Sequence, residues 1–184
     1  KFYRITGAGM QNKGIHPDIT LPSTWDIEEI GESSFDTALP WDKIKPVRFQ
    51  KFSIGASLIS QLNDKHLIRV NNSPNLRYIL DIRKRYEIQK NKEVISLNLT
   101  NRRVEKKERQ EWALNIENKR RASLNLEIFR SYKALQDYND AKETIDDRQD
   151  SEIDVDNDYL LNEGVEILSD FTILNENIFF SKAA

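Results

Sequence analysis

The sequence predicts a mostly α-helical protein with a small β segment at its N-terminus, an α+β chain whose larger part is an irregular helical domain. Apolar residues alternate along residues 1–22, whereas they recur every three to four residues from about residue 55 onwards. Prolines and a glycine interrupt the region between these two parts. With 184 residues, the chain can bury a substantial core, and its 9% aromatic content argues against wholesale disorder.

Residues 1–22 have the pattern of a β segment. Phe2 and Arg4 fall on one face of the expected strand, and Tyr3 and Ile5 fall on the other. The glycines of the stretch GAGMQNKG, and the Pro-Asp pair after it, predict turns. Residues 23–50 are predicted to be a linker, and their aromatic and leucine side chains indicate that this linker packs along a surface.

Residues 51–184 are predicted to form the helical domain. One helix is expected from about residue 55, because Leu58, Ile59 and Leu62 share a face. A second is expected to begin at Ser73, a hydroxyl cap followed by proline in the first turn. The apolar stripe of this second helix is predicted to consist of Leu76, Ile79, Leu80, Ile82 and Tyr86.

Farther along the chain the pattern changes three times. Residues 93–100 alternate and predict an extended segment, and residues 101–140 are again helical in composition. Residues 143–158 are predicted to form an acidic loop that ends at Asp158, the cap of a last helix. That helix is expected to be buried on one side through its apolar residues Leu160, Leu161, Val165, Ile167, Leu168, Phe171 and Leu174.

Charge is distributed unevenly, although the net charge is only −2. Residues 64–133 carry 18 basic and 9 acidic side chains, whereas residues 137–180 carry 2 basic and 14 acidic ones. One interpretation is two solvated helical surfaces that partly pair within the molecule, where each exposed pair contributes about 0–1 kcal/mol. The other is a bipolar surface that docks a charged partner. The absence of cysteine excludes thiolate catalysis, disulfides and cysteine-ligated zinc.

Several partial motifs do not meet the requirements of a ligand site. Gly7, Gly9 and Gly14 lack the Lys-Ser/Thr pair of a phosphate-binding loop, so we interpret them as turn glycines. Asp154, Asp156 and Asp158 share the spacing of a calcium loop, but the glycine and glutamate expected at its sixth and twelfth positions are absent. The two histidines, His16 and His66, lie on different elements with no acidic cluster around them, which disfavours a metal site or a Ser-His triad.

Four basic clusters suggest a further hypothesis, a surface for nucleic acid. Glutamates interleave with these clusters and the isoelectric point is about 5.8, so we disfavour nucleic-acid binding. The clusters are Arg83-Lys84-Arg85, Arg102-Arg103, Lys106-Lys107 and Lys119-Arg120-Arg121.

The N-terminal stretch resembles the segment that closes the protease domain of carboxy-terminal processing peptidases, the tail-specific serine proteases. Other motifs are similar to the periplasmic branch of that family, which carries a C-terminal helical extension, and the last helix has a comparable position. The residues that carry the resemblance are Lys1-Phe2-Tyr3-Arg4, Gly7, Gln11, Lys13-Gly14-Ile15, Pro17-Asp18-Ile19, Ala38-Leu39-Pro40-Trp41-Asp42, Val94-Ile95-Ser96-Leu97-Asn98 and the helix from Tyr159.

The resemblance implies a division of the chain: residues 1–22 as the last β segment of the peptidase domain, 23–50 as the linker and 51–184 as the C-terminal helical domain. Proteases of this family use a serine nucleophile and a lysine general base, which the resemblance places upstream of Lys1. Such a lysine must be neutral, which requires burial, whereas Lys13 lies in a polar turn. We therefore predict no catalytic, cofactor-binding or metal-ligating residue in this chain, and no cofactor.

The partners that the resemblance implies are the PDZ and peptidase domains, protein substrates with apolar C-termini, and an adaptor or a second copy. The implied location is the periplasm, and the chain contains no apolar run long enough to span a membrane. Two alternatives stay open from the residues: a helical interaction module unrelated to proteolysis, and a nucleic-acid-binding helical domain. The resemblance also leads us to expect that further domains precede Lys1.

Overall fold

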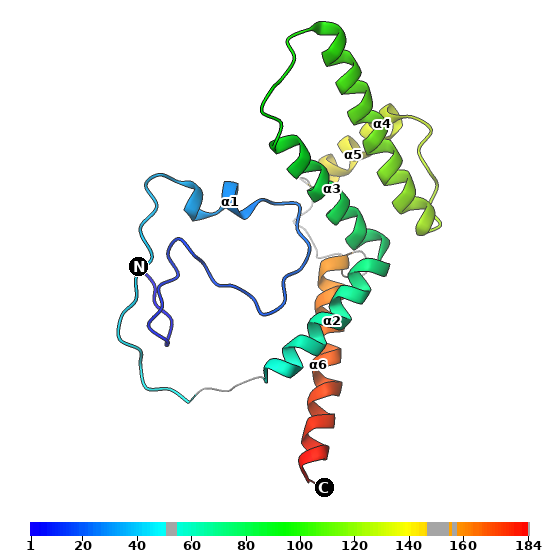
Figure 1. Cartoon of the computed structure of the whole chain (residues 1–184). Helices are drawn as coiled ribbons and strands as arrows, with labels where there is room; N and C mark the ends of the chain where they lie inside the picture. The colour runs from blue at the N-terminus through cyan, green and yellow to red at the C-terminus, as the bar shows by residue number, and fades with distance from the viewer. Residues whose placement is uncertain (51–54, 147–154, 156–157, 184) are drawn as a thin grey trace. The chain divides into compact units, whose positions relative to one another are not determined.

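A computed structural model describes residues 1–50, 55–146, 155 and 158–183, and it confirms that the chain is mostly helical (Figure 1). The chain divides into two compact units, one made of Lys1–Leu67 with Ile167–Ala184 and the other of Ile68–Glu166. The elements are α1 (Ile27–Ile30), the 3-10 helix η1 (Glu32–Ser34), α2 (Ala56–Asn72), α3 (Pro74–Lys90), α4 (Leu99–Ser123), α5 (Tyr132–Asp146) and α6 (Tyr159–Ala183).

The predicted N-terminal β segment is not shown as a strand in the described residues. Residues 2–10 form a tight hairpin, but pairing is limited to two isolated antiparallel bridges, Tyr3 with Gly9 and Ala8 with Lys43. A hairpin this short pairs too few residues to build a ladder, and two-stranded pairings are marginal without a further strand. Gly7 makes the turn at a φ of +79°, where a Cβ atom would collide with the carbonyl of Ile44.

Part of the predicted linker packs against this hairpin. Asp42 accepts hydrogen bonds from the Lys1 ammonium at 3.0 Å and from the Tyr3 hydroxyl at 3.1 Å. The Lys1 hydrogen bond is the main cause that lowers the pKa of the Asp42 carboxyl. The indole of Trp41 donates to the Gly9 carbonyl at 2.9 Å. Surface packing is therefore observed at these residues, whereas the side chains of Trp25, Phe35 and Leu39 are exposed.

In the first unit, the predicted face of α2 is buried. Leu58 and Leu62 are buried as expected, and His66 lies on the same helix with only 2% of its surface exposed. Lys65 forms an ion pair of 2.6 Å with Asp170 of α6, a carboxylate that is itself buried. The contact of α2 with α6 in this unit therefore includes an ion pair, in addition to the buried side chains of Leu58 and Leu62 on α2.

In the second unit, the core lies where α3 begins. The hydroxyl of Ser73 accepts a hydrogen bond from the Leu76 backbone amide at 3.4 Å, and Pro74 occupies the first turn, which confirms the predicted helix start. Leu76 and Ile79 are buried with Val70, and Leu160 packs against them. Leu80 was predicted to belong to the apolar stripe of α3, but its side chain is exposed.

The segment predicted to be extended, residues 93–100, is outside any helix only as far as residue 98, and α4 begins at Leu99, two residues before the predicted residue 101. The side chain of Asn98 accepts hydrogen bonds from the amides of Thr100 and Asn101 and caps the helix. From there α4 returns alongside α3 (Figure 1).

Residues 101–140 were predicted to be helical in composition, and the structure divides them between α4 and α5, with residues 124–131 outside any helix. Asn125 adopts a left-handed conformation with a φ of +56°. The Leu126 amide donates to the Arg121 carbonyl at 2.8 Å and the Asn125 amide donates to the Ala122 carbonyl at 3.2 Å. These are the two bonds of a Schellman motif, in which asparagine occupies the position usually taken by glycine. Asn125 therefore ends α4.

The acidic loop was predicted to begin at residue 143, but α5 continues through Asp146. Most of the remaining loop residues, including Asp154 and Asp156, lie outside the described residues. The end of that loop behaves as predicted, because Asp158 accepts hydrogen bonds from the amides of Leu160 and Leu161 and caps α6.

The buried face of α6 differs from the predicted apolar stripe. Glu163 and Asp170 are buried on it, seven residues apart, whereas Leu161, Val165 and Leu168 are exposed. Glu163 pairs with Arg69 at 3.0 Å within the second unit. Lys65 and Arg69 of α2 neutralise these two carboxylates, which allows them to be buried. The apolar side chains of Leu161, Val165 and Leu168 are left exposed to solvent.

Candidate functional site

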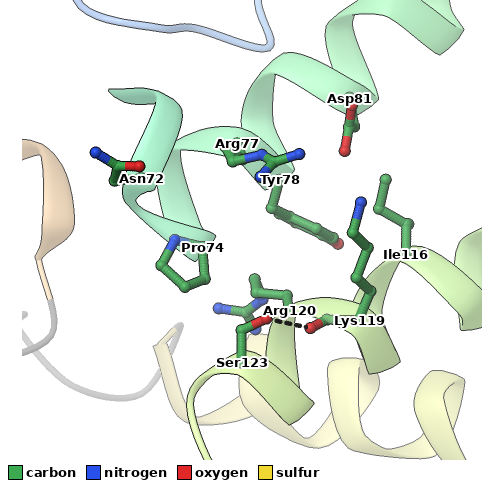
Figure 2. Close-up of a pocket in the computed structure, with 9 residues that line it drawn as sticks. All are labelled: Asn72, Pro74, Arg77, Tyr78, Asp81, Ile116, Lys119, Arg120 and Ser123. Atoms are coloured by element: carbon green, nitrogen blue, oxygen red, sulfur yellow. Dashed lines mark hydrogen bonds between the residues drawn. The ribbon is translucent and has the colours of Figure 1, made fainter. Parts of the chain in front are cut away.

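A pocket of about 280 Å³ lies in the second unit where the start of α3 meets the end of α4 (Figure 2). Its lining is mostly polar, with three cationic side chains and one carboxylate. Figure 2 shows the Tyr78 ring extending from α3 toward α4. The lining residues are Asn72, Pro74, Arg77, Tyr78, Asp81, Ile116, Lys119, Arg120 and Ser123.

Arg120 forms the best-connected ion pair at this pocket. Its guanidinium donates to both carboxylate oxygens of Glu117, at 3.0 and 2.7 Å, and to the side-chain oxygen of Asn75 at 2.9 Å. It also lies 5.0 Å from the centre of the Tyr78 ring. Glu117 is only 4% exposed, and its hydrogen bond raises the pKa of Arg120. A charge buried this deeply requires such a partner, so Arg120 joins α4 to α3.

Arg121 is a second and more distant cation beside the same carboxylate. It lies 3.9 Å from Glu117 and stacks over the rings of Phe129 and Tyr138. The Asn118 side chain holds the Phe129 backbone by two reciprocal hydrogen bonds of 2.8 Å. Glu117 therefore organises the pairing of α4 with α3 and, through Arg121, with the residues that lead into α5.

The pocket places a serine and a lysine together, the residue types of a Ser-Lys dyad, but not in catalytic geometry. The Ser123 hydroxyl donates to the Lys119 backbone carbonyl at 3.0 Å, as Figure 2 shows. The Lys119 side chain is exposed and lacks the apolar burial that a lysine general base requires. Burial, and secondarily the charge of Glu117, raises the pKa of Tyr78, so this phenol stays protonated at neutral pH. These groups support packing and polar contacts.

The residues considered from the sequence are not brought into one site. The Lys13 ammonium lies 4.3 Å from the centre of the Trp41 ring, on the surface of the first unit. His16 is exposed and His66 is buried. Among the residues that the structure describes, no group of three or more histidine, aspartate or glutamate side chains could hold a metal ion.

The basic clusters are partly neutralised by the glutamates that interleave with them. Arg83 pairs with Glu87 at 2.9 Å, and Arg102 pairs with Glu105 at 2.7 Å. The positive charge is thus divided into pairs on the helix surfaces, which weakens the nucleic-acid hypothesis. The sequence indicated the clusters, but it did not indicate that Glu117 would be the buried partner of two of their arginines.

No helix in the described part of the chain is sufficiently long and apolar to cross a membrane. Many of the charged side chains on this mostly helical fold pair with one another.

Comparison with known proteins identifies the family. The family described as "C-terminal domain of tail specific protease" matches residues 25–172. A tail-specific protease of Haemophilus influenzae is 30% identical over 181 residues, which cover 96% of this chain and 24% of that protein. The chain belongs to the family of C-terminal domains of tail-specific proteases. This membership confirms the resemblance and disfavours a helical module unrelated to proteolysis. The chain spans about a quarter of the length of that relative.

Proposed function

We propose that this chain is the non-catalytic C-terminal region of a serine endopeptidase that processes or degrades proteins from their C-terminal tails in the bacterial periplasm. The nucleophilic serine, the lysine general base and a PDZ domain would then belong to another part of a longer protein. Family membership over residues 25–172 supports this proposal, together with the share of the relative's length that the chain spans.

In this proposal, residues 1–22 are the last β segment of the peptidase domain, 23–50 are the linker and 51–184 are the helical domain. The hairpin of residues 2–10 supports this division, because an antiparallel pairing of this size gains stability from a further strand. The contacts of Trp41 and Asp42 with the hairpin would hold the end of the linker against the peptidase core.

The helical domain is proposed to act as a scaffold that docks onto the rest of the protease, a substrate or an adaptor. The observation that carries this role is the run of uncovered apolar side chains between α3 and α4. Leu97 is 97% exposed and Val94 is 80% exposed, and Ile95 and Leu99 are exposed as well. Contiguous exposed apolar side chains mark interaction surfaces in soluble proteins. The open stripe of Leu161, Val165 and Leu168 on α6 has the same character.

The proposal is tested in the full-length protease. Two changes, the deletion of residues 51–184 and, separately, Leu97→Asp combined with Leu99→Asp, are expected to impair turnover of a protein substrate at least severalfold or to disturb assembly. Ile88→Asp serves as a control, because it alters another exposed apolar side chain, on α3. Turnover, assembly and thermal stability that match the unaltered protease in both variants would refute the docking role.

A further inference from the structure

A second cleft lies in the same unit, toward the other end of the α3–α4 pair, and consists of two adjoining hollows of about 160 and 400 Å³. Arg85, Gln89 and Arg109 line both of them, so two guanidinium groups and an amide stand where the hollows meet. The cleft shares no lining residue with the 280 Å³ pocket beside Tyr78 and Arg120.

The larger hollow is mostly apolar. The Arg85 guanidinium lies 5.4 Å from the centre of the Trp112 ring, which is half-buried in the wall. Aromatic walls of this kind bind apolar side chains, and a hollow of this volume accommodates one or two of them. The apolar and aromatic lining residues are Ile82, Tyr86, Trp112, Ala113 and Tyr132.

The cations at the junction lack an anionic partner in the part of the chain that the structure describes. The Nε atom of Arg85 is buried and has no hydrogen-bond partner among the described residues. Glu105, in the smaller hollow, is already engaged by Arg102 at 2.7 Å and by Lys92 at 3.6 Å. Glu108 also lines that hollow but forms no ion pair with either junction arginine. A buried donor without a partner costs free energy, which an anionic ligand would recover.

We propose that this cleft binds a peptide tail that ends in apolar residues and a free carboxylate. The carboxylate would accept hydrogen bonds from Arg85 and Arg109, with Gln89 as a third donor, and the last apolar side chains would enter the hollow beside Trp112. A terminal carboxylate is the peptide group that places a planar two-oxygen anion directly next to apolar side chains. The choice of a protein tail as the ligand rests on the proposed function.

The test uses the 184-residue chain and the heptapeptide Gly-Ser-Gly-Ser-Ala-Val-Leu, labelled with fluorescein at its N-terminus. Fluorescence anisotropy is expected to show saturable binding of the free-acid peptide and at least tenfold weaker binding of its C-terminal amide. A peptide ending in Gly-Ser-Gly, also as the free acid, should bind at least tenfold more weakly than the Ala-Val-Leu peptide.

Two variants and a matched control locate the site. Arg85→Gln and Arg109→Gln should each weaken binding of the free acid about tenfold or more while leaving the amide unaffected. Arg103→Gln removes an exposed guanidinium that lines neither hollow, and it should leave binding unchanged. Circular dichroism verifies that each variant folds. If Arg85→Gln does not fold, the assignment is tested by Arg109→Gln alone, because Arg109 is exposed and its substitution should not disturb the fold.

Equal affinity for acid and amide, or equal loss of binding in Arg103→Gln, would overturn this assignment. The two proposals fail separately. If the 184-residue chain does not bind the tail peptide, but deletion of residues 51–184 impairs turnover, the docking role is supported and the tail site is refuted. Tail binding together with unimpaired turnover would support the tail site and refute the docking role.

Discussion

The two ends of the α3–α4 pair carry similar runs of arginine but use them in opposite ways. At one end Arg120 and Arg121 share the buried carboxylate of Glu117, and their guanidinium faces lie on aromatic rings. At the other end Arg85 also lies over an aromatic ring, yet no ion pair joins it to a residue of the described chain. The arginines beside a buried carboxylate serve packing, whereas the arginine without one is the residue that we propose to be available to a ligand.

The largest expected effect follows from removing the shared carboxylate. Glu117→Ala leaves two partly buried guanidinium groups without an anion, so we expect the free energy of unfolding to fall by about 3–4 kcal/mol. Urea denaturation followed by circular dichroism measures it. Glu111→Ala, which breaks only an exposed pair with Lys107, should change stability by less than about 0.5 kcal/mol. Similar losses in both variants would contradict the structural role of Glu117.

Exchanging one arginine at each end tests the comparison directly. Arg120→Gln leaves the Glu117 carboxylate buried with its weaker partner Arg121, so we expect a loss of about 2 kcal/mol in the free energy of unfolding. Arg85→Gln removes an Nε donor that has no hydrogen-bond partner among the described residues, together with the contact of the guanidinium with Trp112, so the free energy of unfolding should fall by less than about 1 kcal/mol. The same denaturation experiment measures both. If Arg85→Gln proved the more destabilising of the two, the contrast between the ends would be wrong.

A smaller effect is expected where α4 ends. Asn125→Gly places the residue that best tolerates a positive φ at the Schellman position, which should raise the free energy of unfolding by about 0.5 kcal/mol. Asn125→Ala should lower it, because alanine is strained in this conformation. A melting temperature that shifts in the same direction for both variants would argue against the left-handed cap.

The smallest effect concerns an exposed ion pair, that between Lys1 and Asp42. The pKa of Asp42 is lowered in the folded state. The contribution of this ion pair to the free energy of unfolding is therefore present above the unfolded pKa of about 3.9, and it is lost as the pH falls through the folded pKa. The contact of residues 40–47 with the hairpin should therefore loosen in acid, below about pH 4. NMR shifts of the Trp41 indole proton follow this, and Asp42→Asn should abolish the pH dependence attributable to this contact.

Much of the helical architecture could be predicted from the sequence, because its determinants are local. Ser73 with Pro74, and Asp158, begin helices where their side chains satisfy free backbone amides. The break at residues 124–131 was missed because Asn125 is a weaker stop signal than glycine. The N-terminal pattern predicted a strand, yet the structure shows only isolated bridges, since a strand requires a partner that local pattern does not supply.

The sequence by itself determined the helical character of the chain, its basic and acidic segments and, through its motifs, its resemblance to the tail-specific proteases. Only the tertiary structure decided which charges are buried. The sequence did not indicate that Glu117, Glu163 and Asp170 are buried, and it predicted burial for Leu161 and Leu168, which are exposed. Glu163 and Asp170 are buried beside partners that are distant in sequence, Arg69 and Lys65, and the periodicity of one helix does not indicate such a partner. Glu117 has its partners Arg120 and Arg121 on its own helix, but its burial depends on the packing of α4 against α3, which is also a tertiary contact.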